Sequence, residues 1–174
     1  MIRPDEKERA AMIRVDQAGE FGATRIYQGQ LAVLGGRHPH AAAIAGMAAQ
    51  EERHRAVFDA MIAARRVRPT LLSPFWHVAG FALGAATALI GPEAAMACTA
   101  AVETEIDLHY GAQEDRLGDS DPELRGIIAE FRAEEVEHRD AALEHGAERA
   151  PAYPLLSAAI RLGCRAAIRL SERI

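Results

Sequence analysis

Apolar side chains recur along most of this chain in alternating steps of three and four residues, the spacing that keeps them on one face of an α-helix. Prolines and glycines divide the pattern into stretches, and no run of strand-like alternation is long enough to predict a sheet. The pattern predicts helices over residues 5–34, 39–68, 92–117, 121–149 and 154–171. Asp121 and Pro122 are typical of an N-cap and a first helical residue.

The lengths of the connections predict how these helices pack. Few residues separate 5–34 from 39–68, and few separate 92–117 from 121–149, so each pair should form an antiparallel hairpin. The long stretch 69–92 joins the two hairpins. One long crossover in a four-helix bundle is the ferritin-like topology. We therefore expect a single all-α, ferritin-like domain over residues 1–174, with a hydrophobic crossover (69–92) and an extra C-terminal helix (154–171).

Acidic residues and histidines interrupt the apolar face of two helices at the same spacing. Glu51 with His54, and Glu135 with His138, each form a Glu-x-x-His motif, which places a carboxylate and an imidazole on one helix face. The motifs lie within the predicted seams Ile44, Met47, Glu51, His54, Phe58, Met61 and Leu124, Ile128, Phe131, Glu135, His138, Ala142. An unpaired buried carboxylate is costly, and a bound metal ion would neutralise it.

The other two bundle helices each carry a glutamate on their apolar face, so the whole pattern occurs twice. Glu20 precedes the first motif and Glu103 the second, and the order repeats after 83 or 84 residues. Tyr27 and Tyr110 each follow the lone glutamate by seven residues, and we expect each phenol to hydrogen-bond the carboxylate of its own helix.

Four carboxylates and two neutral imidazoles predict a pair of divalent ions. Their four negative charges would balance two Fe(II), and oxygen ligands with two imidazoles favour iron or manganese over zinc or copper. Asp107 and Asp140 lie about a turn from the predicted ligands and are candidates to hydrogen-bond the ligand imidazoles. Glu52, Glu134 and Glu137 fall off the seams, and we interpret them as solvated.

The crossover is uncharged and carries large apolar residues such as Phe75 and Trp76. By length it could span a membrane, but a span would separate the two hairpins and prevent Glu51 and Glu135 from sharing a metal pair. Extra soluble core, shallow membrane insertion and a channel for a greasy substrate remain open, and insertion or a channel is favoured. In helix 154–171 and just beyond, arginines recur every four residues, which is typical of a helix lying on anionic lipid or of a solvated face packed on the bundle.

Composition removes several other classes of function. The 174 residues carry a net charge of −5, which gives no support for nucleic-acid binding. Cys98 and Cys164 form no CxxC motif, so we expect free thiols in a reducing cytosol and no thiolate metal site. The charged residues 1–6 contain no apolar run, so we expect no secretory signal.

With these residues assembled, the chain resembles the demethoxyubiquinone hydroxylase family of ubiquinone biosynthesis over nearly its whole length. The resemblance rests on four segments, RVDQAGEFGA (14–23), EERH (51–54), ETEIDLHY (103–110) and EVEHRD (135–140). The family usually has histidine at the position of Gln17, which is not a metal ligand.

The resemblance implies six iron ligands, two of them bridging: Glu20, Glu51, His54, Glu103, Glu135 and His138, with Glu51 and Glu135 as the bridges. It implies O₂-dependent hydroxylation of the demethoxyubiquinol ring by a centre of two iron ions. It also places His109 and Tyr110 near the path of electrons or substrate, and implies NADH as the ultimate reductant, although no dinucleotide-binding motif is visible.

For partners, the resemblance implies a prenylated quinol, O₂, a membrane surface and other proteins of ubiquinone biosynthesis. We therefore expect a peripheral enzyme on the cytoplasmic face of the cell membrane. The alternative is a ferritin-like or bacterioferritin-like protein that oxidises and stores iron, because it would use the same ligands.

Overall fold

Helices form nearly all of the computed structural model, which describes residues 4–174. The elements are α1 (Glu6–Leu34), α2 (Ala41–Arg65), α3 (Ser73–Ile90), α4 (Pro92–Leu117), α5 (Pro122–Glu144), a short 3₁₀ turn (Ala147–Arg149) and α6 (Tyr153–Arg173). No strand occurs within residues 4–174. The all-α prediction is confirmed, whereas the expectation about the extreme N-terminus rests partly on residues 1–3, which lie outside the described part.

Most predicted helix ends lie within a few residues of the observed ones, and each difference has a local cause. Asp5 caps α1 by a reciprocal pair of hydrogen bonds with Glu8, and the Asp121 carboxylate accepts the amide of Leu124 at the start of α5. The helix predicted to reach residue 149 ends earlier, because Gly146 adopts the left-handed conformation (φ 89°). The second helix begins at Ala41, two residues after the predicted proline.

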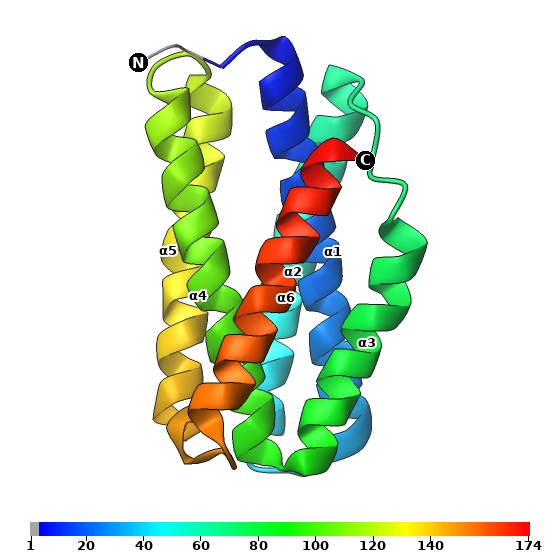
Figure 1. The fold of residues 1–174 in the computed structure, drawn as a ribbon, viewed down its shortest axis with the longest axis vertical. Coiled ribbons are helices and arrows are strands. Elements are labelled where there is room, and N and C mark those ends of the chain that lie inside the picture. Colours follow the sequence, from blue (N-terminus) through cyan, green and yellow to red (C-terminus); the bar gives the residue numbers. More distant parts are fainter. Residues whose placement is uncertain (1–3) are drawn as a thin grey trace.

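Two antiparallel hairpins, α1–α2 and α4–α5, form the bundle, as Figure 1 shows. The crossover between them is itself a helix, α3, which lies alongside α1 and turns directly into α4 at Gly91. Helix α6 lies against α4 and α1. The ferritin-like arrangement predicted from connection lengths is confirmed.

Glycines allow α3 to approach α1 at backbone distance. A Cβ added at Gly84 would lie 1.9 Å from the carbonyl oxygen of Ile26, and one at Gly29 would lie 2.2 Å from that of Phe81. Both approaches are shorter than any van der Waals contact, so only glycine fits there. The inner face of α3 is thus built from small residues, and Gly80, Gly84, Thr87 and Ala88 are its buried positions.

Several large side chains of α3 and α6 point outward. Phe75 is 60% exposed and Leu89 is 74% exposed on α3, while Leu155 and Leu162 on α6 are 73% and 64% exposed. The crossover therefore supplies little soluble core, which was one of the three interpretations left open; Ala88 and the partly buried Leu83 contribute to it. Among the described residues, α3 is the one helix long and apolar enough to cross a membrane.

The arginines of α6 do not form one outward-facing stripe. Arg161 Nε and Arg165 Nη1 donate to the same oxygen of Glu105 on α4, at 2.6 and 3.1 Å, and the Glu105 side chain is only 4% exposed. These two arginines hold α6 on the bundle, as the packed-face alternative requires. The outward face of α6 is largely apolar at Leu155, Leu162 and Leu170.

Candidate metal centre

Six predicted ligands converge in the middle of the bundle, one glutamate from each of α1 and α4 and a Glu-x-x-His motif from each of α2 and α5. None is more than 3% exposed: Glu20, Glu51, His54, Glu103, Glu135 and His138. The burial follows from the seams. Every position predicted to lie on the inner faces of α2 and α5 is buried. An alternating step of three and four residues is sufficient to place these groups inside.

The six side chains form two overlapping groups. In each group the potential ligand atoms lie within 4.8 Å of one another: Glu20, Glu51, His54 and Glu135 in one, and Glu51, Glu103, Glu135 and His138 in the other. Glu51 and Glu135 belong to both groups. The geometry therefore suits two neighbouring ions with two shared carboxylates.

Both imidazoles present the same nitrogen to the carboxylates. His54 Nδ1 lies 3.1 Å from Glu135 Oε1, and His138 Nδ1 lies 3.1 Å from Glu51 Oε1. Each Nε2 points away and meets an outer partner, since His54 Nε2 lies 2.5 Å from Glu134 Oε2 and His138 Nε2 lies 2.9 Å from Gln50 Oε1. Partners of this kind fix ring orientation in metal sites.

The predicted partners of these imidazoles are wrong. Asp107 binds Arg132 and Arg139, and Asp140 binds Arg139, so neither reaches a histidine. Glu134, expected to be solvated, is instead held between His54 and Arg53. The other two glutamates predicted to lie off the seams, Glu52 and Glu137, are exposed as expected.

Three of these buried ligand atoms lie close to one another or to His138 Nδ1 but are not joined by hydrogen bonds within the described residues, namely Glu51 Oε1, His54 Nδ1 and Glu135 Oε1. Buried polar atoms are almost always paired. A cation between them would satisfy all three, and their types, carboxylate oxygen and imidazole nitrogen, suit iron or manganese. The donor set therefore fits a di-metal centre.

The electrostatics also favour positive charge among these side chains. Burial raises the pKa of Glu51 and Glu103 well above the usual value, and the charge of Glu135 adds to both effects. Burial also disfavours a charged Glu135, but His138 and His54 outweigh it and hold its pKa at about 2. Burial alone would lower the pKa of His54, yet the carboxylates around it raise the value to about 10. Without metal, protons must supply the charge that ions would supply.

The two tyrosines are exchanged relative to the prediction. Tyr27 of α1 donates to Glu103 Oε1 of α4 at 2.9 Å, and Tyr110 of α4 donates to Glu20 of α1. Seven residues along one helix span about 10 Å, too far for a phenol to return to its own carboxylate. Because α1 and α4 run antiparallel, the tyrosine of each helix lies level with the glutamate of the other.

His109, the other predicted catalytic residue, lies outside the carboxylate cluster. Its Nε2 is 3.0 Å from Asp16 Oδ1, and its side chain is 11% exposed. The ring is tilted beside Tyr110, with ring centroids 5.9 Å apart. The structure thus brings Tyr110 to a predicted ligand and places His109 between that site and the surface.

The comparisons with known proteins agree with this geometry. The family model described as "Ubiquinone biosynthesis protein COQ7" matches residues 7–171, nearly the whole chain. The chain belongs to the COQ7 family. A 3-demethoxyubiquinol 3-hydroxylase of Rhodospirillum rubrum is 58% identical, over 98% of this chain and 82% of that protein.

Eukaryotic members of the COQ7 family are similar over comparable lengths. The mouse protein named NADPH-dependent 3-demethoxyubiquinone 3-hydroxylase, mitochondrial, is 54% identical over 97% of this chain and 81% of its own length. The 5-demethoxyubiquinone hydroxylase, mitochondrial, of Saccharomyces cerevisiae is 44% identical over 94% and 77%. The resemblance drawn from four short segments is confirmed.

Several residues of the site escaped sequence reasoning. Gln50 and Glu134 each directly precede a glutamate of the seam, so on their own helices they point to the side of it. They meet the histidines of the opposite helix: Gln50 of α2 lies against His138 of α5, and Glu134 of α5 against His54 of α2. The contact between Arg53 and Glu134 was the available signal, because opposite charges beside both motifs suit two helices packed side by side.

Proposed function

We propose that this chain is a di-iron monooxygenase that hydroxylates the ring of demethoxyubiquinol in ubiquinone biosynthesis. The observation that carries the proposal is the convergence of four buried glutamates and two imidazole Nδ1 atoms from both halves of a COQ7-family chain. Overall, a ring C–H becomes C–OH, one atom of O₂ leaves as water, and two electrons and two protons are taken up. The iron-storage alternative is not favoured by the family match.

The ligands would be Glu20, Glu51, His54, Glu103, Glu135 and His138. Glu51 and Glu135 are proposed as bridges because each belongs to both ligand groups. The iron pair, when bound, supplies the redox chemistry with O₂. The chain contributes the rest: Glu134 and Gln50 orient the two imidazoles, and Tyr27 and Tyr110 hold the two terminal carboxylates by hydrogen bonds. The buried ring of Phe131, stacked on His54 with ring centroids 4.0 Å apart, limits access of water on that side.

Electrons are proposed to come ultimately from a reduced nicotinamide dinucleotide. NADH was the expectation from resemblance, whereas the mouse relative's name specifies NADPH. Turnover with each nucleotide and a quinone-reducing partner would distinguish them. We also propose His109 and Tyr110 as the residues nearest the entry of electrons or substrate.

The exposed apolar faces of α3 and α6 support peripheral attachment to a membrane, where a prenylated quinol would reside. Leu71, Phe75 and Val78 near the start of α3 are each at least 60% exposed. Such side chains favour insertion into the headgroup region. The eukaryotic relatives are named mitochondrial, and for this chain we propose the cytoplasmic face of the cell membrane. Other proteins of ubiquinone biosynthesis are proposed partners at that surface.

Truncation before Pro154 tests the contribution of α6 to the membrane surface. It should weaken flotation with liposomes of mixed neutral and anionic lipid. Phe75→Ser should weaken flotation while leaving the helical content unchanged, whereas the exposed charge variant Glu137→Gln should not. Flotation unchanged by both the truncation and Phe75→Ser would remove these helices from the membrane argument.

The decisive test of activity starts from protein loaded with iron anaerobically. A short-tailed demethoxyquinol and a chemical reductant are added, and ¹⁸O₂ is admitted. One ¹⁸O atom should appear in the quinol product by mass spectrometry. Glu135→Ala should give no product and no bound iron, with an unchanged helical circular dichroism spectrum. Iron-loaded wild type that reduces O₂ without hydroxylating the ring would refute the proposed function.

A further inference from the structure

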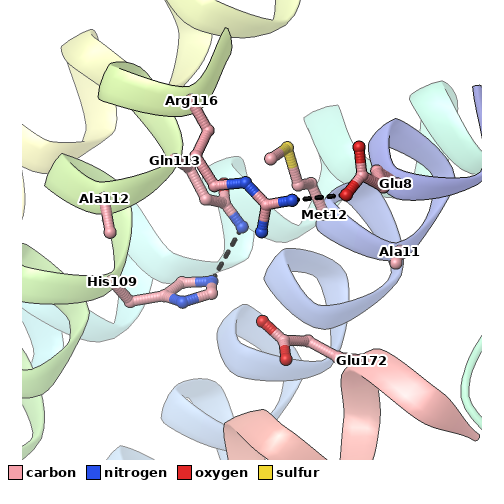
Figure 2. A pocket seen from close by; sticks show the side chains of 8 residues that line it. All are labelled: Glu8, Ala11, Met12, His109, Ala112, Gln113, Arg116 and Glu172. Carbon is pink, nitrogen blue, oxygen red and sulfur yellow. Dashed lines mark hydrogen bonds and ion pairs between the residues drawn. The ribbon is translucent and has the colours of Figure 1, made fainter. Parts of the chain in front are cut away.

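A hollow of about 190 Å³ opens between α1, α4 and α6, and none of the six predicted ligands lines it. Figure 2 shows His109 and Gln113 of α4 on one side of it, the ion pair of Arg116 with Glu8 on another, and Glu172 of α6 below. Charged residues from three helices line this space: Glu8 on α1, Arg116 on α4 and Glu172 on α6. His109 lines the hollow, and its side chain is 11% exposed, so it is open to solvent on this side.

His109, Asp16 and Gln113 form a polar triad on the inner side of the hollow. Asp16 Oδ1 lies 3.0 Å from His109 Nε2 and accepts a hydrogen bond from Gln113 Nε2 at 2.8 Å. Gln113 Nε2 also lies 2.8 Å from His109 Nε2. The Asp16 side chain is fully buried. No described residue binds His109 Nδ1, so one ring nitrogen is held by the triad and the other is left free.

The triad accommodates a proton in either of two places. When the proton is on His109 Nε2, the imidazole donates to an ionised Asp16. When it is on Asp16, the carboxylic acid can donate to Nε2, with Gln113 as a second donor. Burial raises the pKa of Asp16, and the hydrogen bond with His109 opposes that rise. The two states are therefore brought closer in energy than they would be in water.

The triad adjoins the proposed metal centre on two sides. Asp16 precedes Glu20 by one helical turn on α1, and its Oδ2 is buried without a hydrogen-bond partner. On α4, His109 precedes Tyr110, whose hydroxyl donates to Glu20. The charged groups that face this triad are Glu20 on its inner side, and Glu8, Arg116 and Glu172 on the side of the hollow.

We propose that His109, positioned by Asp16 and Gln113, passes protons from the hollow toward the buried carboxylates. A proton from water in the hollow adds to Nδ1, leaving hydroxide that returns to solvent, as the Nε2 proton moves to an ionised Asp16 Oδ1. One O–H and one N–H bond break, one N–H and one O–H bond form, and no oxidation state changes. Asp16 then holds the proton one turn from Glu20. The inference rests on the proposed hydroxylation, which consumes two protons in each turnover.

The test compares Asp16→Asn with Asp115→Asn, an exposed aspartate on α4 without a described ion pair. Asparagine keeps the shape of Asp16 but cannot accept the proton. With saturating quinol, kcat should fall by about a hundredfold, the lower end of typical losses of acid–base catalysis, with little change in KM. The solvent deuterium isotope effect on kcat should rise. Asp115→Asn should match wild type, and Asp16→Glu should recover part of the rate.

Two further measurements separate proton transfer from a structural role. In His109→Gly, added imidazole should enter the hollow and restore part of the turnover. In metal-free protein with ¹⁵N-labelled histidine, both tautomers of His109 should be populated, because an ionised Asp16 accepts from Nε2–H whereas the Gln113 amide donates toward Nε2. Asp16→Asn should shift the population toward the Nδ1–H form, because an amide can donate as well as accept.

The outcomes are distinguishable from failure of the proposed function. If wild type does not hydroxylate, that function fails. If wild type turns over and Asp16→Asn has the same kcat and isotope effect, the proton route is wrong while the function stands. Loss of iron binding in Asp16→Asn, measured by metal analysis, would also overturn the route, because Asp16 would then support the site's structure.

Discussion

Glu134 gives the sharpest test of how the protein matrix supports the proposed metal centre. Its carboxylate lies 2.5 Å from His54 Nε2, and the opposite ring nitrogen faces the carboxylate cluster. Glu134→Gln removes the negative charge but leaves an amide oxygen that can still accept from Nε2. The substitution should therefore weaken the basicity of the imidazole without releasing its orientation.

The size of the effect follows from the contacts. Loss of an outer partner typically costs 10- to 100-fold in metal affinity. Arg53 already neutralises part of the Glu134 charge, and the amide keeps the hydrogen bond, so we expect Glu134→Gln near the lower limit, about tenfold. Tenfold corresponds to about 1.4 kcal/mol. Glu134→Ala loses both charge and orientation and should approach a hundredfold.

The assay is an anaerobic titration of metal-free protein with Co(II) or Fe(II) against a competing chelator. Thermal unfolding gives a second readout. At saturating metal, a tenfold loss of affinity removes about 1.4 kcal/mol of metal-induced stability, or roughly 3–6 °C in Tm for a chain of this size. The metal-free Tm of the variant should change much less.

Glu137→Gln is the matched control, since this glutamate lies three residues farther along α5 and is exposed. Its metal affinity should stay within about twofold of wild type, as for most surface changes. An unchanged affinity in Glu134→Gln, or an equal loss in Glu137→Gln, would refute the assignment of Glu134 as the support of His54.

Three other predictions concern the site, the crossover and the pH dependence of folding. His54→Ala should abolish iron loading while the protein stays helical, and full iron occupancy would contradict the ligand list. Gly84→Ala should lower the free energy of unfolding by about 1–3 kcal/mol or more, because the added Cβ would lie 1.9 Å from a backbone oxygen. The control Gly46→Ala adds a Cβ into open space, so chemical denaturation should show it to be neutral or stabilising. The hydrogen bond from Arg65 holds the pKa of Asp121 below its usual value. The ion pair therefore stabilises the fold fully above the ordinary aspartate pKa of about 4, and this stabilisation is lost as pH falls through the lowered value. Asp121→Asn keeps the helix cap, so its Tm deficit at neutral pH should shrink in acid, and a deficit that is constant with pH would contradict this reasoning.

The seams could be predicted because helix geometry alone determines which residues share a face. Glu51, His54, Glu135 and His138 were placed correctly from spacing, and the doubled order Glu, Glu-x-x-His supplied the other two glutamates. Contacts between side chains of different helices were harder to predict. The tyrosines were assigned to the wrong carboxylates, because the relative direction of α1 and α4 decides which residues lie level, and spacing within one helix carries no such information.

The crossover shows a second limit of the sequence. Its lack of charge was evident, but the same composition fits a core helix, a membrane-facing helix or a span. The choice depends on which side of the helix meets the bundle. Gly80 and Gly84 mark that side, yet glycines in a helix could equally have marked a break.

The exchanged tyrosines have a consequence for how this molecule arose. Tyr27 of the first hairpin donates to Glu103 of the second, and Tyr110 of the second donates to Glu20 of the first. Neither hairpin alone therefore contains a complete hydrogen-bonded pair. An ancestral peptide of one hairpin would have had to associate with a twin to complete either bond. Duplication and fusion through a linking helix would have preserved that mutual dependence within one chain, so the halves cannot now diverge independently at these four positions.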